Sequence, residues 1–111
     1  MPMALEGLRV LEVSRVAVGG FCTMMLADMG ANVIKVEAPP EQGGGLLSDP
    51  ENLRMRRLAV DRNKKSILLN MKHSQGQEIF QKLATTADVL IEGFRPGVMG
   101  RLGAGYDALR K

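Results

Sequence analysis

The residues with the clearest potential for chemistry lie near the end of the chain. An apolar segment at 88–91 runs into the sequence EGFRPG at 92–97, and Arg101 follows on a short predicted helix. An apolar strand that ends in glycine, arginine and a helix start is where α/β proteins bind anions, because free backbone N–H groups and cationic side chains meet there. The segment therefore predicts a site for a phosphate-bearing ligand.

A second group of candidate phosphate contacts lies in a basic segment at 54–65. The candidates are Arg54, Arg56, Arg57, Lys64 and Lys65. Two interpretations stay open, a solvated basic loop or a phosphate site. Nucleic acid is a weaker alternative, because one Tyr, three Phe and no Trp leave few side chains on which bases could stack.

Other chemically interesting residues favour structural roles. The turn at 16–21 follows a strand and opens a helix, but the G-x-G-x-x-G pattern of dinucleotide sites is absent. Glu37 is therefore interpreted as a surface residue at a strand end. His73 is the only histidine and is expected to be exposed. Cys22 has apolar neighbours and is expected to be a packed core thiol.

Length and composition indicate one small domain or part of a larger one, with 111 residues, 45% hydrophobic content and a net charge of +3. The single cysteine excludes an internal disulfide and a cysteine-based zinc cluster, and it fits a reducing cytosol. No signal peptide is visible at 1–10, and no run approaches the ~18 apolar residues of a membrane span. We therefore predict a cytoplasmic protein with no metal site.

The hydrophobic pattern predicts strands at 8–13, 33–36, 66–69 and 87–91. Helices are expected at 21–29, from 74 onward, and after 96 and 105. Ser74 and Gln77 form a capping-box pattern, and residues 38–57 are expected to form a long loop. Apolar strands that alternate with helices predict an α/β fold, a Rossmann-like parallel sheet with flanking helices.

Four segments resemble, in order, those of one enzyme family. They are LEGLRVLE at 5–12, GGFCTMMLADMGANVIKVE at 19–37, RNKKSILLNMK at 62–72 and DVLIEGFRPGVMGRL at 88–102. The family is the class III CoA-transferase and α-methylacyl-CoA racemase superfamily (CaiB/BaiF type). The resemblance implies that residues 1–111 are the N-terminal CoA-binding segment of a larger enzyme and are incomplete relative to the full family fold. Catalytic residues are then expected beyond Lys111, and this segment alone is expected to be inactive.

The resemblance also implies the ligand and its contacts. A CoA thioester would be the substrate, and no prosthetic group is implied. CoA carries a 3′-phosphate and a pyrophosphate, which arginine binds well. The implied CoA-binding residues are Ala17 and Val18 near the thioester arm, Leu68, Leu69, Asn70 and Met71 beside the adenine, and Gly93, Phe94, Arg95 and Arg101 around the nucleotide and its phosphates.

Departures from the family pattern bear on the activity. Ala38 stands where many relatives have arginine, so Arg54, Arg56 or Arg57 is expected to replace that phosphate contact. Gly93 stands where transferases typically have asparagine, which favours a 2-methylacyl-CoA racemase that works through an enolate. The alternatives are a CoA-transferase that moves CoA between carboxylic acids and a non-catalytic nucleotide-binding module. The resemblance implies an interlocked homodimer, with acyl-CoA as the ligand and neither nucleic acid nor membrane as a partner.

Overall fold

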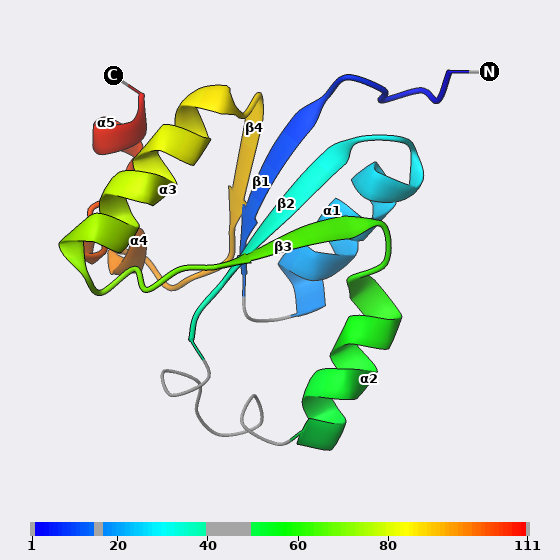
Figure 1. Cartoon of the computed structure of the whole chain (residues 1–111), viewed down its shortest axis with the longest axis horizontal. Coiled ribbons are helices and arrows are strands. Elements are labelled where there is room, and N and C mark those ends of the chain that lie inside the picture. Colours follow the sequence, from blue (N-terminus) through cyan, green and yellow to red (C-terminus); the bar gives the residue numbers. More distant parts are fainter. Residues whose placement is uncertain (1, 15–16, 40–49, 111) are drawn as a thin grey trace.

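The computed structural model describes residues 2–14, 17–39 and 50–110 of the chain. Four parallel strands form one sheet in the order β3-β2-β1-β4, which confirms the predicted Rossmann-like α/β fold (Figure 1). The strands are β1 (Arg9–Val13), β2 (Asn32–Glu37), β3 (Lys64–Leu68) and β4 (Val89–Glu92). The helices are α1 (Ala17–Asp28), α2 (Pro50–Val60), α3 (Ser74–Thr86), α4 (Val98–Arg101) and α5 (Tyr106–Leu109).

Helices cover both faces of the sheet (Figure 1). Along β1 the side chains alternate, so that Val10 packs in a cluster with Ala27 of α1. Leu11 points to the opposite face and packs in a cluster with Phe80 of α3 and Met99 of α4. Burial on both faces explains why the central strand β1 reads as a nearly continuous apolar run.

The order of the strands reverses beside β1. The chain passes from β1 through α1 to β2 and on to β3, and then crosses back through α3 to β4 on the other side of β1. Val13 at the end of β1 is paired with Glu92 at the end of β4. In open α/β sheets, ligands bind outside the carboxyl ends of the strands at such a reversal.

The expected loop at 38–57 is wrong over its last part, because α2 begins at Pro50. Pro50 suits the first turn of a helix, Glu51 favours the positive end of the helix dipole, and most of the residues that follow are good helix formers. The glycines and prolines earlier in the segment obscured this signal. Residues 40–49 lie outside the described residues.

Helix α1 places only part of its apolar surface in the core. Thr23, Met24 and Ala27 are buried, whereas Met25 and Met29 are exposed by 48% and 41%.

The predicted burial of Cys22 is wrong as well, because this residue is exposed. Burial of the Thr23 side chain against the sheet turns its neighbour Cys22 outward.

The start of α3 also differs in detail. The N-cap is His73, whose Nδ1 accepts a hydrogen bond from the Gln75 backbone N–H at 3.1 Å, whereas the capping-box pattern placed the cap at Ser74. Gln77 instead donates its side-chain amide to the Met71 carbonyl at 2.9 Å. His73 is exposed, as predicted.

Candidate functional site

A small cleft lies at the carboxyl end of the sheet, where the strand order reverses. It is lined by residues that follow or end all four strands and by one residue after α4, namely Val13, Ser14, Val36, Ala38, Met71, Lys72, Phe94 and Leu102. We call this the switch-point cleft. Its volume of about 70 Å³ is well below the roughly 300 Å³ at which sites for whole small ligands begin. The cleft therefore suits one part of a larger ligand.

Residues 68–71, which were predicted to border the adenine, alternate between buried and exposed positions. Met71 lines the switch-point cleft, and Leu69 is buried in the core beneath it. Leu68, one residue earlier on β3, is 57% exposed. The Asn70 side chain accepts a hydrogen bond from the Lys72 backbone N–H at 3.1 Å and so shapes the turn after β3.

The predicted phosphate end lies beside the same cleft. Phe94 lines it, and the Phe94 backbone N–H is held by the Glu92 carboxylate at 2.9 Å. Gly93, Arg95 and Arg101 are exposed, and neither arginine forms an ion pair within the described part of the chain. Both guanidinium groups are therefore open to an anionic ligand.

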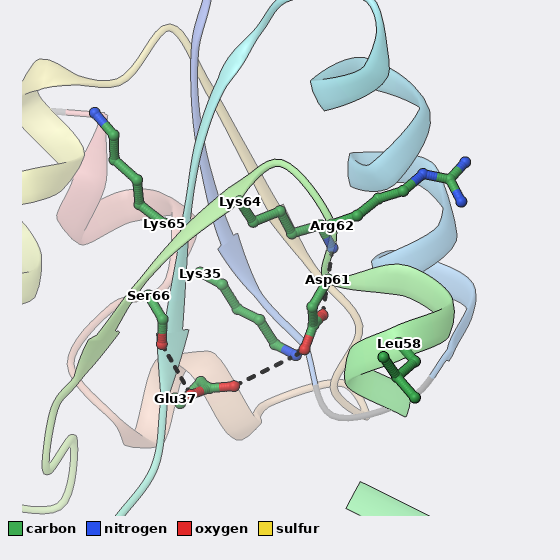
Figure 2. A pocket seen from close by; sticks show the side chains of 8 residues that line it. All are labelled: Lys35, Glu37, Leu58, Asp61, Arg62, Lys64, Lys65 and Ser66. Atoms are coloured by element: carbon green, nitrogen blue, oxygen red, sulfur yellow. Dashed lines mark hydrogen bonds and ion pairs between the residues drawn. The ribbon is translucent and has the colours of Figure 1, made fainter. Parts of the chain in front are cut away.

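The basic segment does not form one cationic surface. Lys64 points into the protein, where its ammonium lies 2.8 Å from a Glu12 carboxylate oxygen and its side chain is 2% exposed. Lys65 is exposed and points away from Lys64 (Figure 2). Arg54 is exposed on α2, and the side chains of Arg56 and Arg57 lie outside the described residues. Because the Lys64 ammonium is buried and already bound to Glu12, it is not available to bind a phosphate.

A larger hollow of about 470 Å³ lies beside these residues, between β2, β3 and the end of α2 (Figure 2). Most of its cations are compensated by carboxylates. Lys35 lies 3.0 Å from Asp61 and 3.6 Å from Glu37, and Arg62 lies 2.7 Å from Asp28. Because only Lys65 of its cations has no carboxylate partner among the described residues, the hollow is a poorer candidate for phosphate than the open arginines beside the switch-point cleft.

Sequence reasoning missed three polar residues near the cleft. Lys72 lines it from the turn after β3, and Ser14 lines it from the end of β1. Glu12, in the middle of an apolar strand, is 0% exposed and bonds to Ser14. The sequence does contain a signal for Glu12. A carboxylate inside an apolar parallel strand predicts polar partners nearby, because a buried charge requires them.

Two carboxylates have clearly shifted pKa values, and both lie outside the cleft. The hydrogen bond from the Arg62 guanidinium lowers the pKa of the Asp28 carboxyl below its ordinary value, and the Asp28 carboxylate in turn raises the pKa of Arg62. The Arg9 backbone N–H, 2.9 Å from Asp88, lowers the pKa of the Asp88 carboxyl. Neither arrangement prepares a general acid or base, since both favour a permanently charged carboxylate at neutral pH.

The described residues also contain no group of three or more His, Cys, Asp or Glu side chains that could hold a metal ion. Over the same ranges, no helix is long and apolar enough to cross a membrane. What the geometry offers is an anion-accessible end of an α/β sheet.

Comparison with known proteins identifies the family of this chain. A family model described as CoA-transferase family III matches residues 5–111, and the chain belongs to this family. It is 41% identical to an acyl-CoA transferase of Fusarium pseudograminearum, over 97% of this chain and 26% of that protein. It is also 41% identical to the succinyl-CoA:glutarate CoA-transferase of Mus musculus, over 96% of this chain and 25% of that protein.

A solved structure agrees with the fold. The crystal structure of Rv3272 from M. tuberculosis matches 97% of this chain with a TM-score of 0.86 and 40% identity, but only 30% of that chain is covered. The present chain therefore spans about a quarter of the length of these curated relatives and under a third of this solved one.

The comparisons favour the transferase alternative over the racemase. The relatives are named as CoA-transferases, and none of these comparisons supports the racemase interpretation drawn from Gly93. A single glycine in place of asparagine changes one exposed turn, which is too local a feature to decide between two reactions.

Proposed function

We propose that this chain is the CoA-binding N-terminal segment of a CoA-transferase that moves CoA between carboxylic acids. The observation that carries the proposal is the switch-point cleft, which gathers residues from the ends of all four strands in a chain of the CoA-transferase family III. CoA enters as a thioester substrate, and the proposal requires no prosthetic group. The cytoplasmic location stays a prediction from the sequence.

In this proposal the nucleotide end of CoA lies against the β4–α4 turn. Arg95 and Arg101 are exposed there, and arginine forms charge-assisted hydrogen bonds with phosphate. Phe94 and Met71 line the apolar part of the cleft, and Lys72 adds an ammonium from the turn after β3.

The remaining proposed contacts extend from this centre. Ala17 and Val18, at the start of α1, lie near the thioester arm, and Leu68, Leu69, Asn70 and Gly93 border the nucleotide mainly through their backbones. Arg54, Arg56, Arg57 and Lys65 are candidate contacts for the outer phosphates.

The reacting groups are proposed to come from a longer polypeptide. A transferase of this kind needs an aspartate carboxylate that attacks the acyl-CoA, which gives a mixed anhydride and the CoA thiolate. The thiolate then attacks the aspartyl carbonyl carbon, releases the donor carboxylate and leaves an aspartyl-CoA thioester. Among the described residues that line the switch-point cleft there is no Asp, Glu, His or Cys side chain. We therefore expect the 111-residue chain to bind CoA without transferring it.

We further propose that the chain associates with a second copy. Phe21, Met25 and Met29, at i, i+4 and i+8 along α1 and its end, are 54%, 48% and 41% exposed, and we call them the α1 stripe. A contiguous exposed apolar stripe of this kind favours association, and methionine adapts to many partners.

The reaction is tested by following two products at once in a longer protein that contains this chain. The protein is incubated in D₂O with succinyl-CoA or a 2-methylacyl-CoA and an acceptor carboxylate, and the thioesters are separated by mass spectrometry. A transferase produces the acceptor's CoA thioester without deuterium at the α-carbon. Deuterium at the α-carbon of recovered 2-methylacyl-CoA, with no CoA exchange, would instead establish the racemase.

A further inference from the structure

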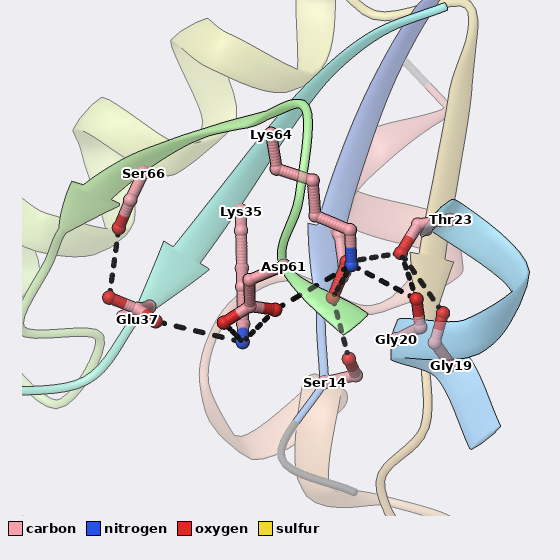
Figure 3. Close-up of polar contacts among 10 residues, drawn as sticks. Ser14, Gly19, Gly20, Thr23, Lys35, Glu37, Asp61, Lys64 and Ser66 are labelled. Atoms are coloured by element: carbon pink, nitrogen blue, oxygen red, sulfur yellow. Dashed lines mark hydrogen bonds and ion pairs between the residues drawn. The ribbon is translucent and has the colours of Figure 1, made fainter. Parts of the chain in front are cut away.

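Glu12 is a charged residue at the centre of the sheet. Its side chain is 0% exposed, and three side chains donate to its carboxylate (Figure 3). Ser14 Oγ donates to Glu12 Oε1 at 3.0 Å, and Lys64 Nζ donates to Glu12 Oε2 at 2.8 Å. Thr23 Oγ1 also donates to Glu12 Oε2. We call Glu12, Ser14, Thr23 and Lys64 the Glu12 network.

Stability alone is a weak reason for this arrangement. Removing two charges from water costs several kcal/mol for each ion, and well-packed apolar residues of similar volume are often equally stable or more stable. The rest of β1 is largely apolar, with Val10, Leu11 and Val13 all buried. We therefore looked to a role that the polar groups of the network can perform and apolar side chains cannot.

The contacts of the network join the end of β1 to the start of α1. Ser14 directly follows β1, and the Gly20 carbonyl in the first turn of α1 accepts a hydrogen bond from Lys64 Nζ at 3.0 Å. Thr23 Oγ1 lies 3.1 Å from the Gly19 carbonyl oxygen as well. The Glu12 carboxylate thus links Ser14, which follows β1, to Thr23 in α1.

Packing between Ser14 and the start of α1 is tight. A Cβ added to Gly19 would lie 3.0 Å from Ser14 Cβ, and one added to Gly20 would lie 3.2 Å from Val60 Cγ2. A displaced Ser14 would therefore press on the first turn of α1. Ser14 in turn lines the switch-point cleft.

We propose that Glu12 is a positioning residue, which holds Ser14 and the first turns of α1 in the arrangement that binds CoA. It acts through the hydroxyl groups of Ser14 and Thr23, while Lys64 supplies the counter-charge that allows the carboxylate to be buried. This inference rests on the proposed function, because that function places the thioester arm of CoA at the start of α1, near Ala17 and Val18.

The test compares two double variants that differ only in a hydrogen-bonding group. E12Q/K64M and E12L/K64M both remove the two charges and keep the volumes similar. The glutamine of the first variant retains an oxygen and an amide for the hydroxyls of Ser14 and Thr23, whereas the leucine of the second retains neither. The measurements on the 111-residue chain are the melting temperature, the Kd for CoA by calorimetry, and amide hydrogen exchange at Phe21 and Thr23.

We expect E12Q/K64M to bind CoA within about threefold of wild type and E12L/K64M to bind about tenfold more weakly, which corresponds to roughly 1.4 kcal/mol. Exchange at Phe21 and Thr23 should be about tenfold faster in E12L/K64M, with Phe80 in α3 as an unaffected reference. Equal CoA affinities and equal exchange rates in the two variants would overturn the proposal and leave a purely structural ion pair.

Two further outcomes are distinguishable. If wild type does not bind CoA, the proposed function fails, and the exchange rates still decide whether Glu12 holds the first turns of α1. If E12L/K64M does not fold, S14A/T23V takes its place, because it keeps the ion pair and removes both hydroxyl groups. This variant should show the same losses, and wild-type values for it would contradict the proposal.

Discussion

Lys64 and Glu12 form an ion pair of 2.8 Å in which the two side chains are 2% and 0% exposed, although the next residue, Lys65, is exposed. The alternation of a strand sends two neighbouring lysines to opposite faces of the sheet. Identical side chains at consecutive positions on β3 therefore have different roles, one inside the Glu12 network and one at the surface.

Replacing each lysine by methionine should show this difference. Lys64→Met leaves the Glu12 carboxylate buried without its counter-charge, and breaking a buried pair in this way costs about 3–5 kcal/mol of unfolding free energy. Lys65→Met is the matched control and should stay within about 0.5 kcal/mol of wild type. Urea unfolding followed by circular dichroism measures both, and similar losses for the two variants would contradict the assignment.

Gly76 should not tolerate a side chain. A Cβ at this position would lie 1.9 Å from the Asn70 carbonyl oxygen and 2.7 Å from its carbonyl carbon, so the first turn of α3 would have to move away from the end of β3. We expect Gly76→Ala to destabilise the chain by about 1–3 kcal/mol or more. Gly100→Ala in α4 is the control, because nothing lies within 4 Å of the added atom. Thermal melts that rank the two variants equally would be inconsistent with this packing.

Stability should fall in acid partly through Asp88. Because the Arg9 backbone N–H lowers the pKa of the Asp88 carboxyl below its ordinary 3.8, the folded state binds this proton less readily than the unfolded state does. The resulting stability is present above pH ~4 and is lost as pH falls through the lowered pKa. Asp88→Asn should therefore flatten part of the acid branch of a plot of melting temperature against pH.

The control for that experiment is Asp107→Asn. In the wild-type chain the Asp107 side chain is 92% exposed and lies 3.9 Å from Arg110. This substitution should leave the acid branch unchanged. Added salt should shrink the part of the Asp88 effect that comes from the Arg9 guanidinium, 3.6 Å from the carboxylate, because both charges are at the surface and are screened. An acid branch as steep in Asp88→Asn as in wild type would rule out this carboxylate as a contributor.

The α1 stripe predicts association of the 111-residue chain. We expect sedimentation equilibrium to show a mass above that of the monomer, which rises with concentration, because Phe21, Met25 and Met29 leave an apolar face in water. Met25→Lys should shift the equilibrium toward monomer. Ile79→Lys on α3, at a residue 44% exposed on the opposite helical layer, should not. A wild-type chain that is monomeric at all concentrations would refute this prediction.

The sequence predicted the sheet well because the central strands β1 and β2 are largely buried, which produces apolar runs that few other structures require. It failed where a helix's orientation depends on a partner distant in sequence. Thr23 is buried because its hydroxyl reaches Glu12, and this contact turns Cys22 outward, which no pattern within α1 reveals. Helix α2 was missed because a Gly- and Pro-containing stretch precedes Pro50.

The candidate site was only partly predictable for a similar reason. The family resemblance implied Phe94 and Met71 as ligand contacts, and both line the cleft at the carboxyl end of the sheet. Ser14 and Lys72 line the same cleft, but each lies in a short connection with no distinctive motif. Lys64 looked like its neighbours in a basic run, and only the strand register showed that it points inward.

The central claim, that this chain binds CoA at the carboxyl end of its sheet, is tested most directly by calorimetric titration of the 111-residue chain. The ligands are CoA, dephospho-CoA, which lacks the 3′-phosphate, and pantetheine, which lacks the nucleotide. The protein variants are wild type, Arg101→Ala and Arg110→Ala, the last being a matched surface arginine near the chain end.

We predict one saturable CoA site, with affinity that decreases from CoA to dephospho-CoA to pantetheine. Arg101→Ala should weaken CoA about tenfold or more, since a charge-assisted phosphate contact contributes roughly 1.5–3 kcal/mol, and it should narrow the difference between the three ligands. Arg110→Ala should bind as wild type does. The absence of saturable CoA binding, or equal binding of pantetheine and CoA by wild type, would contradict the account.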